Sequence, residues 1–331
     1  MNDAVWDAYP ELFHYTSQKG LEGILRSQTL WATNARYLND ASELRLMRGR
    51  LPDLIVREIE NALHAKARRD IQHKVAFERE GGFAVVARRL AQEWTSLMHD
   101  VLIEGDAAGL GFFVTSFSAE PPIDRFSRYQ GLLSQWRAYG RDGGYAIVFD
   151  TKGFNTLLKK EVEQWKCQIT FDDVAYENDL PVEVERKLAC DLKSICDAIS
   201  QWIDEPRTIP KSAFRPFISC AARYKHHAFC EEREVRLIIA AERPSNSPRL
   251  QQQTTCPTEM RRYYFERNGT IVPCVHLFER CGDEAALLPI NRIIVGPHRD
   301  QERRTAGLKS VLADLGLSHI VVSESDIPYL E

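Results

Sequence analysis

The chain has 331 residues, of which 44% are hydrophobic and 27% are charged, and its formal net charge is −4. This composition is typical of a globular protein with a sizeable core, and it excludes wholesale disorder. The slight excess of acidic residues argues against non-specific binding to long nucleic acids as the main activity, while leaving room for a local basic patch.

The first third of the chain predicts two short strands and then long helices. Residues 12–16 form the first predicted strand, and Ser17 is a typical N-cap for the amphipathic helix that follows. Residues 30–33 predict a second strand, and Asn39-Asp40 marks a turn or a helix cap. The apolar residues between about 41 and 105 then recur at helical spacing, which predicts two long amphipathic helices.

The middle of the chain alternates strands with helices. A strand is predicted over residues 111–118, a short helix over 132–139 and a nearly all-apolar, central strand over 145–150. Residues 165–171 predict another strand. Two further helices are expected between about 182 and 229.

The last third returns to strands. Residues 237–241 predict a strand, and Asn268-Gly269 is a strong hairpin signal between two apolar runs. A strand over 293–295 precedes a last helix with Gly316 as its C-cap, and residues 320–322 predict a closing strand.

This order favours a single α+β domain over residues 1–331. Strands occur at the start, the middle and the end of the chain, so two independent halves are disfavoured. The helices at about 41–105 and 182–229 then read as insertions into one sheet.

Signals for export, membrane insertion and metal binding are weak. Residues 1–10 contain acids and no apolar run, and no stretch approaches 18 apolar residues, so we expect a cytoplasmic protein without a membrane span. None of the eight cysteines belongs to a C-x-x-C pair. Although Cys274, His276 and Cys281 are close in sequence, their spacing is unlike that of zinc knuckles, and we expect no metal.

Candidate site residues lie at predicted strand ends, because no P-loop, dinucleotide fingerprint or nucleophile elbow is present. His14, Tyr15 and Thr16 close the first strand, although a histidine beside a tyrosine is commonly structural. Ser116 belongs to a hydroxyl-rich strand end that either holds a ligand or caps a turn. Tyr139 shares a helix face with Trp136, which is typical of core packing.

The pattern Glu232, Glu234 and Arg236 is the most informative in the chain. Residues spaced by two on a strand share one face, so the two carboxylates and the guanidinium are expected side by side. Such charges are costly to bury without partners. The face is therefore either exposed to solvent or the wall of a polar pocket.

The order of these motifs resembles the bacterial domain-of-unknown-function family 2971 over roughly residues 12–297. The resemblance is carried by His14-Tyr15-Thr16, Gly20-Leu21 with Ile24-Leu25, Leu30-Trp31, Asn39-Asp40 with Glu43, Phe117-Ser118, Trp136-Arg137 with Tyr139, Gly144, Phe229 with Glu232, Glu234 and Arg236, and Ile293-Ile294-Val295-Gly296-Pro297.

The opening strand and helix also resemble ADP-ribosyltransferase-type domains, which implies a mixed or antiparallel sheet core and NAD as substrate. Under this resemblance Glu234 would stabilise the oxocarbenium ion that forms when the nicotinamide–ribose bond breaks, and Glu232 would orient the acceptor. His14 would bind the adenosine-side ribose.

The same resemblance implies supporting roles for the other candidates. Thr16 or Ser116 would steady the dinucleotide, and Tyr139 or Tyr15 would stack on nicotinamide. Arg236 would pair with one of the glutamates or bind a phosphate.

Three functions follow as alternatives. The first is an NAD-dependent ADP-ribosyltransferase-like protein, for example a toxin or phage-defence effector that modifies nucleic acid or protein and has an antitoxin or defence-system partner. The second is a non-catalytic module of the same fold that binds a nucleotide or a protein. The third is a metal-dependent nuclease or hydrolase that uses Glu232, Glu234 and Asp40.

Overall fold

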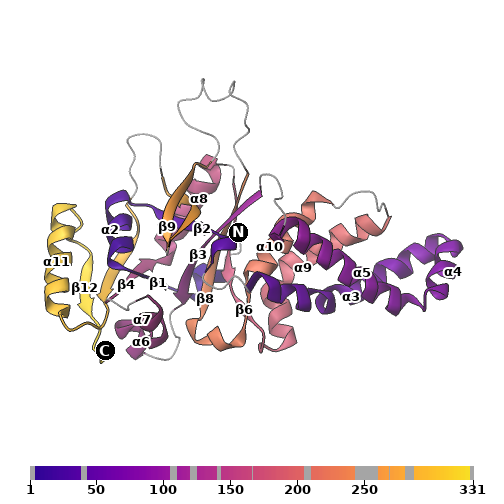
Figure 1. Cartoon of the computed structure of the whole chain (residues 1–331), viewed down its shortest axis with the longest axis horizontal. Coiled ribbons are helices and arrows are strands. Elements are labelled where there is room, and N and C mark those ends of the chain that lie inside the picture. Colours follow the sequence, from indigo (N-terminus) through magenta and orange to yellow (C-terminus); the bar gives the residue numbers. More distant parts are fainter. Residues whose placement is uncertain are drawn as a thin grey trace, which may run out of the picture. The chain divides into compact units, whose positions relative to one another are not determined.

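The computed structural model describes residues 4–38, 43–104, 110–119, 125–139, 143–165, 167–204, 210–242, 260–267, 269–279 and 287–328 (Figure 1). The predicted turn at Asn39-Asp40 and residue Asn268 of the predicted hairpin lie outside these residues. The chain forms two compact units. We call Met1–Asn34, Phe113–Asp173 and Ala228–Glu331 the sheet unit, and Ala35–Phe112 with Val174–His227 the helical unit.

The sheet unit is built on one large sheet that is mostly antiparallel. Its main path runs, in spatial order, through β12 (Val321–Glu324), β11 (Ile290–Val295), β4 (Tyr145–Asp150), β1 (Glu11–Thr16), β3 (Leu110–Ala119), β2 (Leu30–Asn34), β10 (Thr270–Leu277) and β9 (Arg262–Arg267). Beside this path, β8 (Glu234–Glu242) pairs with both β3 and β5 (Gln168–Asp173). Among the described ladders of this sheet, only β11 and β12 run parallel.

Helices cover both faces of this sheet. They are α1 (Ala4–Ala8), α2 (Gln18–Ser27), α6 (Arg125–Gln130), α7 (Leu133–Tyr139), α8 (Thr151–Trp165) and α11 (Gln301–Asp314), with the short 3-10 helix η4 (His227–Glu232) before β8. Helix α2 begins after Ser17, whose hydroxyl accepts a hydrogen bond from the Gly20 amide as the sequence predicts. It ends at Ser27, and the C-cap residue Gln28 adopts a left-handed conformation.

The two faces of the sheet contribute to two hydrophobic clusters. The main core gathers apolar residues of α2, α8, α11 and alternate strand positions, among them Leu21, Phe117, Phe154 and Leu308. A smaller cluster, on the other face of β1, contains Phe13, Tyr15, Trp136, Ala146, Val148 and Ile294. Because strand side chains alternate, His14 and Thr16 lie on the main-core face of β1, whereas Phe13 and Tyr15 lie on the other.

The helical unit consists mainly of the two predicted helical segments. It contains η1 (Ala35–Tyr37), α3 (Glu43–Arg69), α4 (Ile71–Arg79), α5 (Phe83–His99), the π-helix η2 (Asp100–Glu104), α9 (Pro181–Asp204), η3 (Lys211–Ala213) and α10 (Phe214–Ala222). Two short strands, β6 (Ala175–Tyr176) and β7 (Tyr224–Lys225), pair in parallel and join these helices. The predicted helix that runs to about residue 229 therefore ends earlier, at Ala222, because the chain continues as β7.

The α+β class and the mixed, mostly antiparallel sheet are confirmed. One expectation about the candidate residues is wrong. Glu232 ends η4 and is not part of β8, so it does not share a strand face with Glu234 and Arg236. The reason is local, since Arg233 adopts a left-handed backbone with φ of 45°, which interrupts the extended conformation. No helix within the described ranges has the length and apolar character needed to span a membrane.

Candidate functional site

His14 lies where β3 changes partner. Strand β3 pairs with β1 through Ala119 and Ser118, and with β2 through Val114 and Phe113. Between these two ladders, the Ser116 carbonyl accepts a hydrogen bond from His14 Nδ1 at 3.0 Å. The His14 ring is tilted against Phe117, with ring centroids 5.7 Å apart. The imidazole thus takes the place of a strand partner for this segment of β3.

This hydrogen bond fixes which ring nitrogen carries the proton. A carbonyl oxygen only accepts hydrogen bonds, so Nδ1 is the donor and the neutral ring keeps its lone pair on Nε2. Burial lowers the pKa of His14, which outweighs the opposing effect of the Ser116 carbonyl and keeps the ring neutral near pH 7. Within the described residues Nε2 has no hydrogen-bond partner. His14 therefore presents a fixed, uncharged acceptor.

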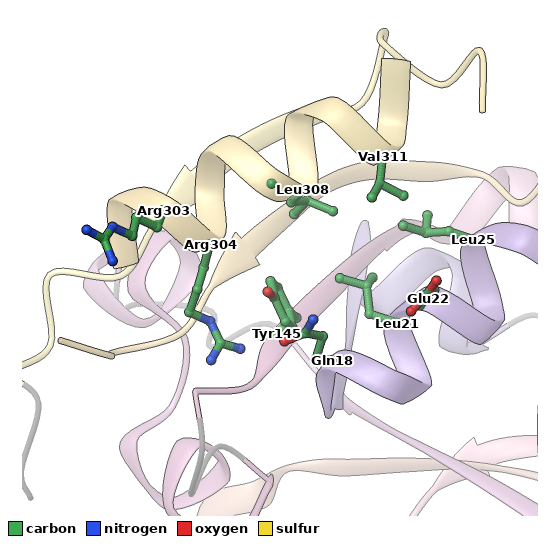
Figure 2. A pocket seen from close by; sticks show the side chains of 10 residues that line it. Gln18, Leu21, Glu22, Leu25, Tyr145, Arg303, Arg304, Leu308 and Val311 are labelled. Carbon is green, nitrogen blue, oxygen red and sulfur yellow. The ribbon is translucent and has the colours of Figure 1, made fainter. Parts of the chain in front are cut away.

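A groove begins on the same face of the sheet. In the β1–β4 ladder, Ile147 lies opposite His14 and Tyr145 lies opposite Thr16, and directly opposed residues share a face. Tyr145 forms part of a groove of about 350 Å³ between α2 and α11. Figure 2 shows the side chains that line it, which are Gln18, Leu21, Glu22, Leu25, Tyr145, Arg303, Arg304, Leu308 and Val311, together with Gly307.

The groove combines an apolar middle with a cationic end. Leucine and valine side chains of α2 and α11 face each other across it, and Arg303 and Arg304 both lie on the first turns of α11 (Figure 2). The Arg304 guanidinium lies over the Tyr145 ring, 5.0 Å from its centroid, and donates a hydrogen bond to the Gly143 carbonyl. The adjacent arginines near the N-terminus of α11 were the signal for the cationic end.

Glu234 and Arg236 form a buried ion pair. Arg236 Nε donates to Glu234 Oε1 at 2.6 Å, and Nη2 donates to Oε2 at 3.0 Å, so both carboxylate oxygens are engaged. Their exposed fractions are 6% and 2%. The predicted pairing of Arg236 with a glutamate is therefore present. Asp172 of β5 lies directly opposite Arg236 in the ladder with β8, which adds a second carboxylate at this position.

The structure does not bring Glu234 to the side of His14. Val235 and Leu237, which alternate with Glu234 and Arg236, belong to the main core. The ion pair consequently lies on the opposite face of β8. Since His14 lies on the main-core face of β1, the two residues are on opposite faces of the sheet.

Thr16 and Ser116 also lie on opposite faces of the sheet. Thr16 lies on the face of His14, with its hydroxyl over Gly20, where a Cβ atom would collide with it. Ser116 alternates with Phe117, so its side chain points to the other face even though its carbonyl binds His14.

The two tyrosines are also apart from His14. Tyr15 lies in the smaller cluster, where its hydroxyl accepts a hydrogen bond from the Leu132 amide at 2.8 Å and its ring meets Trp136 edge-on. Burial raises the pKa of Tyr15. Tyr139 is the last residue of α7 and is 43% exposed.

Three residues of the family motifs meet at one tightly packed point. The Trp136 indole donates to the Gln130 carbonyl at 2.9 Å and lies against Gly296. The Gly296 amide donates to the Gly144 carbonyl at 2.9 Å. A Cβ on Gly296 would come within 2.8 Å of that carbonyl and of the indole, which explains the glycine.

Part of the chain matches a known protein family. Residues 135–237 match a family model described as Protein of unknown function (DUF2971). The matched segment contains Tyr139, Glu232, Glu234 and Arg236, whereas His14 lies outside it. No curated protein and no solved structure matches the chain. Over residues 135–237 the match supports the resemblance to this family that the order of the motifs indicates.

Proposed function

We propose that this chain binds a ribonucleotide, with NAD as the first ligand to test, along the face of the sheet that carries His14 and the groove. The observation that supports this most strongly is the fixed tautomer of His14. A neutral acceptor can bind a hydroxyl or an N–H group, which donate hydrogen bonds, but not an ionised phosphate or carboxylate, which only accept them. The hydroxyls of a ribose are such donors, as the ADP-ribosyltransferase-like interpretation of His14 expects.

The groove supplies complementary chemistry on the same face. Arg303 and Arg304 would attract the pyrophosphate, and the first turn of α11 adds the positive end of a helix dipole. The apolar side chains between α2 and α11 offer a surface for a base. A ligand with a ribose, an anionic linker and a flat ring uses all of these features.

Binding without turnover is the mode that the geometry supports best. The catalytic candidate Glu234 is buried, has both oxygens engaged by Arg236 and lies on the other face of the sheet from His14. A carboxylate in this state is poorly placed to stabilise positive charge on a ribose bound at His14. The nucleotide-binding module is therefore the first candidate.

ADP-ribosyl transfer is the second candidate, and one backbone feature favours it. Glu232 is less buried than Glu234 and precedes Arg233, whose left-handed φ of 45° is the kind of strain that clusters at functional sites. In this reaction the nicotinamide–ribose bond breaks, nicotinamide leaves and an acceptor nucleophile bonds to the ribose carbon. Nucleic acid or protein would be the acceptor, and toxicity with a cognate antitoxin or defence partner is expected of this candidate only.

The metal-dependent hydrolase gains no support at its predicted residues. Among the described residues, the one group placed to hold a metal does not include Glu232 or Glu234. Asp40, the third predicted ligand, lies outside the described ranges.

The test is calorimetric titration of the full chain with NAD, together with an assay of nicotinamide release in the presence of DNA, RNA or cell lysate. Glu232→Gln and Glu234→Gln report on turnover, with unfolding curves to show that each variant is folded. His319→Ala, which removes an exposed histidine elsewhere in the sheet unit, is the matched control for His14→Ala.

NAD binding that His14→Ala weakens, without release of nicotinamide, supports the binding module. Release that Glu232→Gln or Glu234→Gln abolishes in a folded protein supports ADP-ribosyl transfer. Absence of both binding and release would contradict the proposal.

A further inference from the structure

Glu177, His226 and His227 gather in the helical unit, outside the site described above. Strands β6 and β7 pair in parallel, with Tyr176 opposite Lys225. The Glu177 amide donates to the Lys225 carbonyl at 3.0 Å, so the ladder brings Glu177 beside His226. His227 follows as the first residue of η4. Residues distant in sequence are thus held together by backbone hydrogen bonds.

The strand ends that carry these side chains are well fixed. Asp179 accepts from the Tyr176 amide at 3.0 Å and from Lys187 Nζ at 2.8 Å, which locks the turn after β6. Before β7, Arg223 is almost fully buried, and its guanidinium donates to Asp191 at 2.7 Å. The three side chains therefore extend from a rigid base, which is what pre-organises a ligand site.

Their atoms are spaced like metal ligands and unlike hydrogen-bond partners. Glu177 Oε2 lies 3.5 Å from His226 Nε2 and 3.6 Å from His227 Nδ1. Both distances exceed the 2.7–3.2 Å typical of a hydrogen bond. Ligand atoms about 2.0–2.1 Å from a tetrahedral zinc ion lie about 3.3–3.4 Å from one another. All three ligand atoms lie within 4.8 Å of one another, so a small closing movement completes the geometry.

The two imidazole rings lie side by side, with centroids 4.3 Å apart. One nitrogen of each ring faces the Glu177 carboxylate, so a single cation between these three groups would contact all of them.

We propose that Glu177, His226 and His227 bind a divalent transition-metal ion, with Zn²⁺ as the first ion to test. Two imidazole nitrogens and one carboxylate oxygen suit Zn²⁺, Co²⁺ or Ni²⁺ better than Mg²⁺ or Ca²⁺, which prefer oxygen ligands. Three protein ligands leave a fourth position for water. This proposal departs from the expectation of no metal, because Glu177 and the histidine pair are distant in sequence and are brought together only by the pairing of β6 with β7.

The experiment titrates the full chain, first treated with a chelator, with Zn²⁺ in a calorimeter and with Co²⁺ under visible absorption spectroscopy. The variants are Glu177→Gln, His227→Ala and the control His319→Ala. Thiols also bind zinc, so a Cys190→Ser/Cys230→Ser variant removes two exposed cysteines of the described chain. Unfolding curves of all variants confirm that the fold is retained.

We expect the chain to bind one equivalent of Zn²⁺. Loss of a residue that only supports a metal ligand lowers metal affinity roughly 10–100-fold. Glu177→Gln and His227→Ala each remove a direct ligand, so each should lower the affinity by more than that. His319→Ala and the cysteine variant retain it, and Co²⁺ gives a spectrum without thiolate charge transfer. Unchanged affinity in Glu177→Gln and His227→Ala, or loss of binding in the cysteine variant alone, would overturn the proposal.

Discussion

The two units use their histidines in opposite ways. In the sheet unit, His14 Nδ1 donates a hydrogen bond to the Ser116 carbonyl. The other ring nitrogen, Nε2, is a neutral acceptor on the main-core face. In the helical unit, the side chains of His226 and His227 are 42% and 53% exposed, and each directs a ring nitrogen toward the same carboxylate oxygen. The group that each ring nitrogen faces therefore differs between the units. In our proposals, Nε2 of His14 suits a hydrogen-bond donor, and the His226 and His227 rings beside Glu177 suit a cation.

Carboxylates follow the same contrast. Glu234 is buried and fully engaged by Arg236, whereas Glu177 is exposed and lies beside two imidazoles. The first arrangement favours a structural role and the second favours metal binding. The predictions below test this contrast in order of the expected effect.

The largest effect is expected from Arg236→Met. The substitution leaves the Glu234 carboxylate buried without its bidentate partner, which typically costs about 3–5 kcal/mol of unfolding free energy. Urea unfolding measures the loss. Arg137→Met, which removes an exposed arginine of α7, is the control and should change stability little. A loss below about 1 kcal/mol for Arg236→Met would show that Glu234 is not held in this way.

Glu11 offers a second test of a buried, partnered carboxylate. Burial alone would raise its pKa, but Arg292, Asn291 and Arg128 together lower it below 4.5. A lowered pKa in the folded state means that the stabilisation is present above the unfolded pKa and is lost as pH falls through the folded pKa. Glu11→Gln should cost about 2 kcal/mol at pH 7 and flatten the acid limb of stability against pH. Equal acid sensitivity of the variant and the original chain would contradict this.

A smaller pH effect is expected from His14. Burial lowers its pKa below 6.5, so the unfolded chain binds the proton more readily than the folded chain. Stability is then lost as pH falls from about 6.5 toward the folded pKa, by about 1.4 kcal/mol for each unit of difference. His14→Asn removes this slope. NAD binding should weaken over the same range, because protonated Nε2 no longer accepts a hydrogen bond.

Glu177→Gln should have the smallest effect on the metal-free protein. The Glu177 carboxylate is exposed, and substitution of such a group usually changes the unfolding free energy by no more than about 0.5 kcal/mol. Metal-free and metal-loaded unfolding curves measure it. A large loss in the metal-free state would assign Glu177 a structural role and weaken the contrast with Glu234.

Local sequence patterns predicted much of the fold. The cap at Ser17, the apolar run of β4 and the helical periodicity of α9 depend on neighbouring residues, so they can be read without the structure. The spacing of Glu234 and Arg236 also predicted correctly that they share one face of a strand, and their pairing is what the ADP-ribosyltransferase resemblance implied.

Features that depend on distant residues could not be predicted. The groove joins α2 to α11 from opposite ends of the chain, and the parallel pairing of β6 with β7 brings Glu177 to His226. Glu232 was expected to alternate with Arg233 and Glu234 along one strand, but the left-handed backbone of Arg233 interrupts the strand. An arginine carries no local sequence signal for that conformation.

The central claim is that Nε2 of His14 accepts a hydrogen bond from a ribose hydroxyl. The most direct measurement titrates the original chain and His14→Ala with NAD and with an analogue whose adenosine-side ribose lacks both hydroxyls. We predict that the original chain binds the analogue roughly tenfold more weakly than NAD, and that His14→Ala binds both with the same reduced affinity. If His14→Ala binds NAD as tightly as the original chain, or still distinguishes the two ligands, the claim is contradicted.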